Sequence, residues 1–203
     1  ATHAVRVLRM SEGDSIRITD GKGHFFDGTI TLASNKHCCV DILAKHKCEP
    51  LWAGKIHLAV APTKNMDRIE WFAEKATEIG LDEIHFLCCT NSERKVIKTE
   101  RIEKIVVAAT KQSHKAVVPI IHEMKTFQQF IAHPFDGQKF IAHCYDEIPD
   151  TENYKPFLKD LIEAESNKPA IVLIGPEGDF SVEEVKLAIS KGYQPIHLGK
   201  SRL

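Results

Sequence analysis

Residues 175–179, with the sequence Gly-Pro-Glu-Gly-Asp, form the segment best suited to bind a ligand. They follow directly on residues 170–174, a continuous apolar run typical of a parallel strand that is covered on both faces. Two glycines around a rigid proline let backbone N–H and C=O groups approach a flat ligand such as adenine without an intervening Cβ. In open α/β sheets, ligands bind in the crevice beyond the carboxyl ends of the strands. The segment therefore predicts a ligand site, although its glycine content alone fits an ordinary turn at least as well.

A second glycine stands at the end of another expected strand, in the pair Leu198-Gly199, where it is suited to line the other side of the same crevice. The motifs of other nucleotide-binding classes are absent. There is no G-x-x-x-x-G-K-[ST] for a triphosphate, and no G-x-G-x-x-G after a strand for a dinucleotide. There is also no Gly-x-Ser-x-Gly, and no cysteine or serine has a motif that marks an activated nucleophile. Kinases, nicotinamide enzymes and covalent catalysis are therefore disfavoured.

Metal chemistry has little support in the sequence. The six cysteines include two adjacent pairs, Cys38-Cys39 and Cys88-Cys89, but no C-x-x-C spacing with which two thiolates grip one metal. Adjacent side chains of a strand point to opposite faces, so we expect buried, reduced thiols. The 11 histidines are scattered along the chain and form no H-E-x-x-H motif. We therefore predict no metal site.

Two patterns of secondary structure must position these residues. Residues 15–19, 25–30 and 38–43 have the pattern of short strands, and the Asp-Gly-Lys-Gly turn at 20–23 has glycines that supply positive φ. This part predicts a small β-barrel or sandwich. Near Glu49-Pro50 the pattern changes to alternating strands and helices, which is typical of a parallel α/β sheet. The expected strands are residues 55–61, 84–88, 140–143, 170–174 and 195–198, and the expected helices are residues 66–79, 100–113, 156–164 and 182–191.

The formal charge of −1 hides an uneven distribution. Residues 1–55 carry 8 Lys and Arg against 6 Asp and Glu, residues 91–115 carry 7 against 3, and the rest carries 12 against 19. Two local segments are thus suited to an anionic partner, although short charge excesses are more often just solvated faces. No run approaches the ~20 apolar residues that span a bilayer, and the N-terminus has no signal-peptide pattern. We therefore predict a cytoplasmic protein without membrane association.

Taken together, the motifs resemble one family. The Gly-Pro-Glu-Gly loop before a helix, followed by Leu198-Gly199, is similar to the RsmE family of 16S rRNA uridine-N3 methyltransferases, within the SPOUT (trefoil-knot) superfamily. Three further segments match it: residues 3–10, Ser92-Glu93-Arg94, and residues 108–113 with their Gln112-Ser113. The resemblance spans nearly the whole chain. The chain departs from the family at two positions, with Asp179 for a usual glycine and Ser201 for a usual arginine.

The resemblance implies an α/β fold in two domains. Residues 1–52 would form a PUA-like β-barrel that helps to hold RNA. Residues 53–203 would form a SPOUT domain, a parallel sheet with helices on both faces whose chain threads a knot, a topology that depends on the resemblance alone because knots are rare. The family has a strand before Ala1, and an Arg-Thr-Glu-Thr-Ala segment and a final helix after Leu203, so we expect the second domain to be C-terminally incomplete. A homodimer with its active site near the interface is also implied.

The resemblance further implies S-adenosylmethionine-dependent methylation of uridine N3 in 16S rRNA of the small ribosomal subunit, giving 3-methyluridine at position 1498. The donor would contact His143, Cys144, Gly175, Glu177, Gly178, Leu198, Gly199 and Leu203. Uracil N3 carries a proton, so a base must remove it or a cation must stabilise the resulting anion. The expected catalytic residues are Glu177, Arg9 and Arg94, although Glu177 fits a backbone-capping or ion-pairing role equally well. The expected RNA contacts are Arg6, Arg9, Arg94, Lys111, Gln112 and Lys115.

Two alternatives stay open on the sequence alone. In the first, the chain is a non-catalytic rRNA-binding protein with a vestigial donor pocket. In the second, it is an α/β enzyme that acts on a free nucleotide instead of RNA. Binding of S-adenosylmethionine separates the first from a methyltransferase, and salt-sensitive binding of an rRNA fragment argues against the second.

Overall fold

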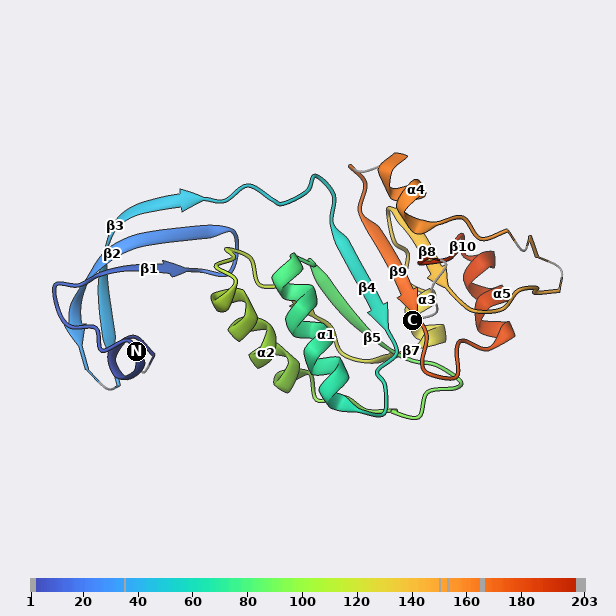
Figure 1. The fold of residues 1–203 in the computed structure, drawn as a ribbon, viewed down its shortest axis with the longest axis horizontal. Coiled ribbons are helices and arrows are strands. Elements are labelled where there is room, and N and C mark those ends of the chain that lie inside the picture. Colours follow the sequence, from blue (N-terminus) through green and yellow to red (C-terminus); the bar gives the residue numbers. More distant parts are fainter. Residues whose placement is uncertain (1–2, 35, 150, 153, 165–166, 200–203) are drawn as a thin grey trace. The chain divides into compact units, whose positions relative to one another are not determined.

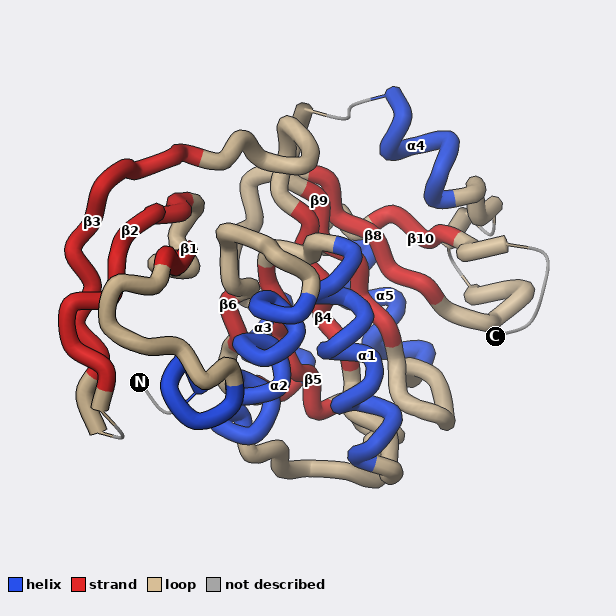
Figure 2. The backbone as a smooth tube through the Cα atoms, turned by 60° about the vertical axis from the view of Figure 1, so that its left-hand side comes forward, coloured by secondary structure: helices blue, strands red, loops and turns tan. Residues whose placement is uncertain are grey.

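The computed structural model describes residues 3–34, 36–149, 151–152, 154–164 and 167–199, which belong to two compact units. The first unit comprises residues 1–50 together with His114–Val118, and the second comprises Leu51–Ser113 and the chain from Pro119 onward. A short segment after the second long helix therefore returns to the N-terminal unit, which the sequence pattern does not reveal. Figure 1 follows the chain through both units, and Figure 2 separates helices from strands.

The first unit is a small antiparallel sheet. Its elements are a short π-helix η1 (His3–Val7) and the strands β1 (Ser15–Thr19), β2 (His24–Ala33) and β3 (Cys38–Lys47), which pair in the order β1-β2-β3. Gly21 and Gly23 of the β1–β2 turn have φ of 69° and 100°, as the turn pattern predicts. The returning segment binds to this turn, because Gly23 N–H donates to Ala116 O and Val118 N–H donates to Gly21 O, both at 2.9 Å.

The second unit is built on a parallel sheet with the strand order β10-β8-β9-β4-β5-β6, and β7 also pairs with β5. Its strands are β4 (Ile56–Val60), β5 (Glu83–Cys88), β6 (Ile120–Ile121), β7 (Lys125–Thr126), β8 (Gln138–Ala142), β9 (Ala170–Ile174) and β10 (Gln194–Ile196). Its helices are α1 (Met66–Ile79), α2 (Thr99–Gln112), α3 (Phe127–Ile131), α4 (Leu158–Ala164) and α5 (Val182–Ser190). Non-consecutive neighbours such as β9 and β4 place distant segments of the chain side by side.

Caps and apolar faces fix the helices. The side chain of Asn65 accepts a hydrogen bond from Asp67 N–H at the start of α1, and Gly80 ends this helix with φ 114°. Ser181 and Glu184, which are three residues apart, form a capping box at the start of α5. The buried residues of α1 and α2 recur at helical spacing and include Ile69, Ala73, Ile102, Val106 and Ala109. The bounds of α1 are those that the apolar periodicity predicts.

Helices cover both faces of the sheet. One core lies beneath α3 and α5 and includes Leu173 together with Phe127 and Phe180. The other lies beneath α4 and includes Val172 and Phe140. Because successive residues of a strand point to opposite faces, Val172 and Leu173 show that these cores are on opposite sides of β9. Figure 1 shows α1 and α2 together beside β4 and β5.

The predicted fold class is confirmed, with an α/β unit on a parallel sheet and a small antiparallel sheet before it. The sequence pattern does not predict α3, β6 or β7, which are short. The prediction of buried thiols was partly wrong: all six cysteines are free and Cys89 is buried, but Cys39 and Cys144 are exposed. Among the described helices, none is long and apolar enough to cross a membrane.

Candidate functional site

Three neighbouring strands of the second unit end at the same level. In the parallel pairing, Ile196 of β10 lies opposite Ala142 of β8, which lies opposite Ile174 of β9. The segments that leave these strands, residues 197–199, 143–149 and 175–180, therefore emerge side by side. Ligands bind at this edge in open α/β sheets. The fold thus gathers the segments that the sequence predicts to form a donor site.

Asp179 ties the Gly-Pro-Glu-Gly-Asp loop to the end of β8. Its Oδ2 accepts a hydrogen bond from Cys144 N–H at 2.7 Å, and its Oδ1 accepts one from Phe180 N–H at 2.7 Å. The residue has φ 60°, the left-handed conformation that favours glycine but that aspartate tolerates better than most residues. Tyr145 adds a second link, because its hydroxyl donates to Phe180 O at 2.7 Å. The aspartate that departs from the family pattern therefore keeps a glycine-like backbone and adds two hydrogen bonds.

The glycines of the loop lie where a side chain would be crowded by its neighbours. A Cβ at Gly175 would come within 3.1 Å of the ring and the backbone nitrogen of Phe180. A Cβ at Gly178 would lie 3.2 Å from Cβ of Asn91. Asn91 also donates through Nδ2 to the carbonyl oxygens of Gly178 and Asp179, at 3.0 and 3.1 Å. The loop is thus clamped between the segments that follow β5 and β8.

His143 is the residue that most directly indicates a ligand. Both of its ring nitrogens are buried and have no hydrogen-bond partner within the described part of the chain. Burial lowers the pKa of His143, and the nearby Lys155 lowers it further, so the ring is neutral near pH 7. Buried polar atoms normally have partners. A polar ligand at the three strand ends would supply them, and the site therefore fits a group such as the adenosine part of S-adenosylmethionine.

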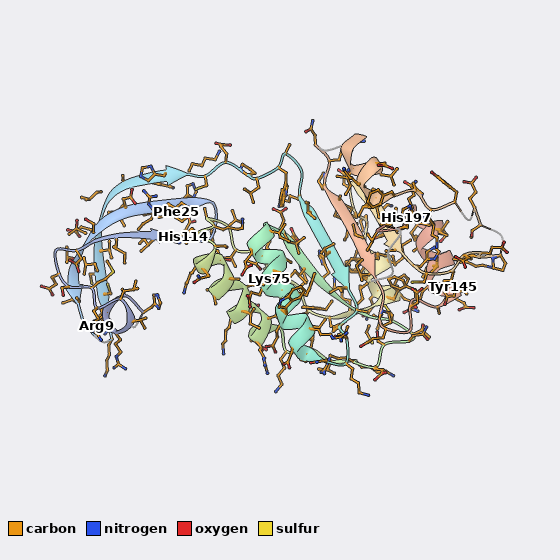
Figure 3. All side chains as sticks on the ribbon, viewed as in Figure 1. Arg9, Phe25, Lys75, His114, Tyr145 and His197 are labelled. Atoms are coloured by element: carbon orange, nitrogen blue, oxygen red, sulfur yellow. The ribbon has the colours of Figure 1, made fainter. Side chains whose placement is uncertain are left out.

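Leu198 and Gly199 follow β10 at the same edge of the sheet. Gly199 has φ 141°, and a Cβ built there would meet no atom of the described residues within 4 Å. The preceding Leu198 is 40% exposed, so an apolar side chain faces solvent beside the glycine. Figure 3 shows His197 and Tyr145, which follow β10 and β8, in the same part of the second unit. Leu203, the last expected donor contact, lies outside the described residues, as does Ser201.

Glu177 and Arg94 both hold the loop between β4 and α1. Oε1 of Glu177 accepts a hydrogen bond from Lys64 N–H at 2.9 Å, which lowers the pKa of the Glu177 carboxyl. Arg94 donates through Nε to Thr63 O at 3.1 Å and through Nη2 to Lys64 O. Each side chain therefore has a structural partner. For Glu177 this arrangement supports the backbone-capping role rather than that of a base, because a lowered pKa weakens a carboxylate as a proton acceptor.

The expected RNA contacts are divided between the two units. Arg6, Arg9 and Lys115 belong to the first unit, where Arg9 is exposed with φ 56° (Figure 3). Lys111 and Gln112 are exposed at the last turn of α2 in the second unit. The basic residue in this turn also lies where the helix dipole favours a cation, which is a sufficient structural reason for it.

Several contacts that organise the site are not predicted by the sequence pattern. Glu184 is 2% exposed and accepts hydrogen bonds from Ser181 N–H and from Thr90 N–H, both at 2.8 Å. Lys155 donates through Nζ to Tyr145 O at 2.6 Å. The capping-box spacing identifies the bond between Glu184 and Ser181. The bond between Glu184 and Thr90, which follows β5, depends on the strand order of the sheet, and no local pattern contains that order.

Comparisons with known proteins agree with this geometry. Residues 50–203 match a family model described as an RNA methyltransferase domain, and residues 1–43 match one described as an RNA methyltransferase PUA domain. The chain is 30% identical to ribosomal RNA small subunit methyltransferase E of Synechocystis, over 96% of this chain and 63% of that protein. It is 28% identical to the Bacillus subtilis enzyme of the same name, over 91% of this chain and 73% of that protein. The chain thus spans less than two thirds of the Synechocystis relative.

Solved structures give the same result. A probable rRNA-methyltransferase from Porphyromonas gingivalis aligns with a TM-score of 0.89 and 40% identity, over 100% of this chain and 83% of that one. A putative methyltransferase from Legionella pneumophila, solved with S-adenosylmethionine bound, aligns with a TM-score of 0.82 and 26% identity, over 100% of this chain and 81% of that one.

Proposed function

The chain belongs to the RsmE family of RNA methyltransferases, and from this membership we propose that it transfers a methyl group from S-adenosylmethionine to N3 of a uridine in 16S rRNA. The observation that carries the proposal is that β10, β8 and β9 end at the same level beside His143, whose ring nitrogens have no hydrogen-bond partner among the described residues. The names of the Synechocystis and Bacillus subtilis relatives support the small-subunit rRNA as substrate. Such a substrate would place the protein in the cytoplasm.

We propose that the donor binds mainly to backbone groups at the ends of these three strands. The residues that would hold it are His143, Cys144, Gly175, Gly178, Leu198 and Gly199, with Leu203 as an expected further contact. When bound, S-adenosylmethionine supplies a methyl group already activated on a sulfonium. The protein then gains rate chiefly by holding the uracil nitrogen in line with that methyl group and by excluding water. Glycines at the loop serve this purpose because they allow the backbone to approach the donor closely.

The protein must also assist deprotonation of the uracil, because N3 must lose its proton before it acts as a nucleophile. We propose that Arg94 or Arg9 stabilises the negative charge that develops on the uracil O2 and O4. Arg94 uses Nε and Nη2 on the loop of residues 63–64, and its guanidinium has further N–H donors. Glu177 is assigned a positioning role, since its carboxylate already accepts the Lys64 N–H.

RNA binding is proposed for the first unit, as a PUA-like domain, and for the end of α2. Arg6, Arg9 and Lys115 of the first unit and Lys111 and Gln112 of the second are the proposed contacts. Lysines and arginines bind phosphates without regard to sequence, so this part of the affinity would fall steeply with salt. We also propose a homodimer, as in the family, with the trefoil knot in the second unit.

Two substitutions at Glu177 separate its possible roles. In Glu177→Gln, the amide oxygen still accepts the Lys64 N–H, whereas Glu177→Ala loses that bond. A positioning role predicts methylation near the wild-type rate in Glu177→Gln and a loss in Glu177→Ala, measured with small ribosomal subunits and saturating S-adenosylmethionine. If Glu177 is the base, Glu177→Gln should instead lose about 100-fold or more in rate.

Calorimetry with S-adenosylmethionine tests the proposed function against a non-catalytic rRNA-binding protein. Asp179 stands where the family usually has a glycine, and it adopts the left-handed conformation that a glycine would adopt, so it gives no support to a vestigial pocket. We therefore expect saturable binding of one donor per chain. Absence of binding to the full chain would contradict the proposed function and favour the non-catalytic alternative.

A further inference from the structure

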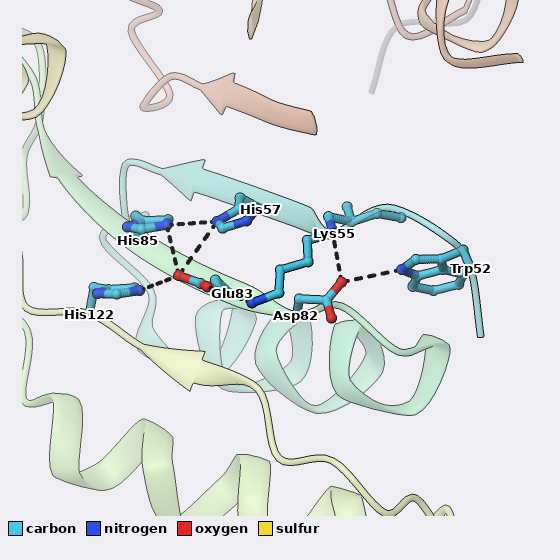
Figure 4. Close-up of polar contacts among 8 residues, drawn as sticks. Trp52, Lys55, His57, Asp82, Glu83, His85 and His122 are labelled. Carbon is cyan, nitrogen blue, oxygen red and sulfur yellow. Dashed lines mark hydrogen bonds and ion pairs between the residues drawn. The ribbon is translucent and has the colours of Figure 1, made fainter. Parts of the chain in front are cut away.

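Three histidines that are far apart in the sequence surround one carboxylate in the second unit. His57 of β4 lies opposite Glu83 of β5 in the sheet register, and His85 follows two residues later on the same face. His122 follows β6, and its N–H donates to Ile84 O, which continues the pairing of β6 with β5. Figure 4 shows the three imidazole rings directed at the carboxylate of Glu83.

The distances among three of these groups suit a metal ion. Nδ1 of His57 is 3.4 Å from Nε2 of His85, and Oε2 of Glu83 is 3.5 and 3.7 Å from these two nitrogens. Zinc binds nitrogen and oxygen ligands at about 2.0–2.2 Å, which puts tetrahedral ligand atoms about 3.3–3.6 Å apart. The three atoms therefore already form one face of a coordination tetrahedron, and little movement would be needed to bind an ion.

The surroundings favour neutral imidazoles, which are the form that binds metals. Burial lowers the pKa of His57 and of His85, and the neighbouring histidines lower that of His85 further, to about 3. The ring of Phe135 packs edge-on against His57, and that of Phe130 against His85, so the two imidazoles are held in place. Besides Glu83, the charged groups that act on these two histidines include Lys55, Asp82 and Lys125, and Lys55 Nζ is 3.9 Å from Oε1 of Glu83.

His122 has a different part in the cluster. Its Nε2 lies 2.7 Å from Oε2 of Glu83, which is hydrogen-bond distance, and its ring stacks on that of His85 with centroids 4.0 Å apart. Carboxylates and imidazoles that bind metals are commonly oriented by such neighbouring groups. His122 is also the most exposed of the four side chains, at 37%, so an ion could enter from its side.

We propose that His57 Nδ1, His85 Nε2 and Glu83 Oε2 form a binding site for a divalent transition-metal ion of the zinc class, with His122 orienting the carboxylate. Imidazole and carboxylate ligands in this number suit Zn²⁺, with a water as the fourth ligand. The site lies at the beginning of β4 and β5, whereas the candidate donor site lies beyond the carboxyl ends of the strands. The site is therefore separate from the proposed donor site, and an ion bound there would link the neighbouring strands β4 and β5.

Cobalt spectroscopy on the full chain tests this site. Tetrahedral Co²⁺ bound by nitrogen and oxygen absorbs in the visible region, whereas cobalt bound to thiolate gives a strong near-ultraviolet charge-transfer band. We expect metal-free protein to bind one equivalent of Co²⁺ with visible absorption and no thiolate band, and Zn²⁺ to displace it. Zn²⁺ should also raise the melting temperature, because it binds the folded chain. Absence of visible absorption in the wild-type protein, or a spectrum dominated by thiolate bands, would overturn the proposal.

Matched variants locate the ion. His85→Gln should abolish the visible absorption, and His122→Gln should weaken Co²⁺ binding by roughly 10–100-fold, as expected for a residue that orients a ligand. His133→Gln is the control, because His133 is an exposed histidine in the same unit. Circular dichroism shows which variants are folded. Unchanged Co²⁺ affinity in a folded His85→Gln or His122→Gln protein, or an equal loss in His133→Gln, would place the ion elsewhere.

Discussion

Asp179 offers the sharpest test of how the candidate donor loop is held. Its carboxylate accepts two backbone N–H groups, from Cys144 and Phe180, each at 2.7 Å. A hydrogen bond to a charged group contributes about 1.5–3 kcal/mol, and the lower value applies to a half-buried side chain such as this one. Removing both bonds should therefore cost about 3 kcal/mol of the free energy of unfolding.

Three substitutions separate the hydrogen bonds from the backbone conformation. Asp179→Gly loses both bonds but suits φ 60°, so we expect a loss of about 3 kcal/mol. Asp179→Ala should lose about 1 kcal/mol more, because alanine is strained in the left-handed region. Asp179→Asn keeps one acceptor oxygen and tolerates that region, so its loss should be about half that of Asp179→Gly.

Equilibrium urea unfolding measures these losses, and amide hydrogen exchange locates them. A local loss of about 1.4 kcal/mol corresponds to tenfold faster exchange, so the amides of Cys144 and Phe180 should exchange at least about tenfold faster in Asp179→Gly. Unchanged protection of both amides, together with a free energy of unfolding within about 0.5 kcal/mol of wild type, would refute this reasoning.

Three further predictions concern the loop and the RNA contacts. Gly178→Val should abolish S-adenosylmethionine binding in calorimetry, because its Cβ would lie 3.2 Å from Cβ of Asn91 and its methyl groups closer still; wild-type affinity would contradict this. Arg9→Ala should leave donor affinity unchanged and reduce methylation of small ribosomal subunits, and full methylation would remove Arg9 from the proposed RNA contacts. Because its bond to Lys64 N–H lowers the pKa of Glu177, the stability from that bond is present above pH 4.5 and lost below it. The stability difference between wild type and Glu177→Ala should therefore shrink in urea unfolding as the pH falls below 4.5, and a difference independent of pH would argue against the bond.

Local sequence patterns predict those helices and strands that are determined by interactions between residues close in the sequence. The apolar periodicity and the terminal Gly80 define α1, and the continuous apolar run defines β9, each with the bounds that the structure has. The capping box of Ser181 and Glu184 marks the start of α5 in the same way. The helix α3 is only five residues long, and it forms where Phe127 and Ile131 are buried in the core. Its position depends on tertiary packing, which the local pattern does not contain.

Features that depend on strand order could not be read from spacing. That the segments after β8, β9 and β10 contact one donor was implied by the family resemblance, and it is the register that brings Ile196 and Ile174 to either side of Ala142. The histidines illustrate the same limit. They are scattered in the sequence, yet the pairing of β4 with β5 sets His57 beside His85 around one carboxylate.

The most direct test of the proposed function is mass spectrometry of nucleosides from 16S rRNA. In cells that lack this protein, we expect 3-methyluridine to be lost from the small-subunit rRNA. Incubation of small subunits from those cells with the full chain and S-adenosylmethionine should restore it. Unchanged 3-methyluridine in the deleted strain, or no restoration by a chain that binds the donor, would contradict the proposal that this protein methylates uridine N3.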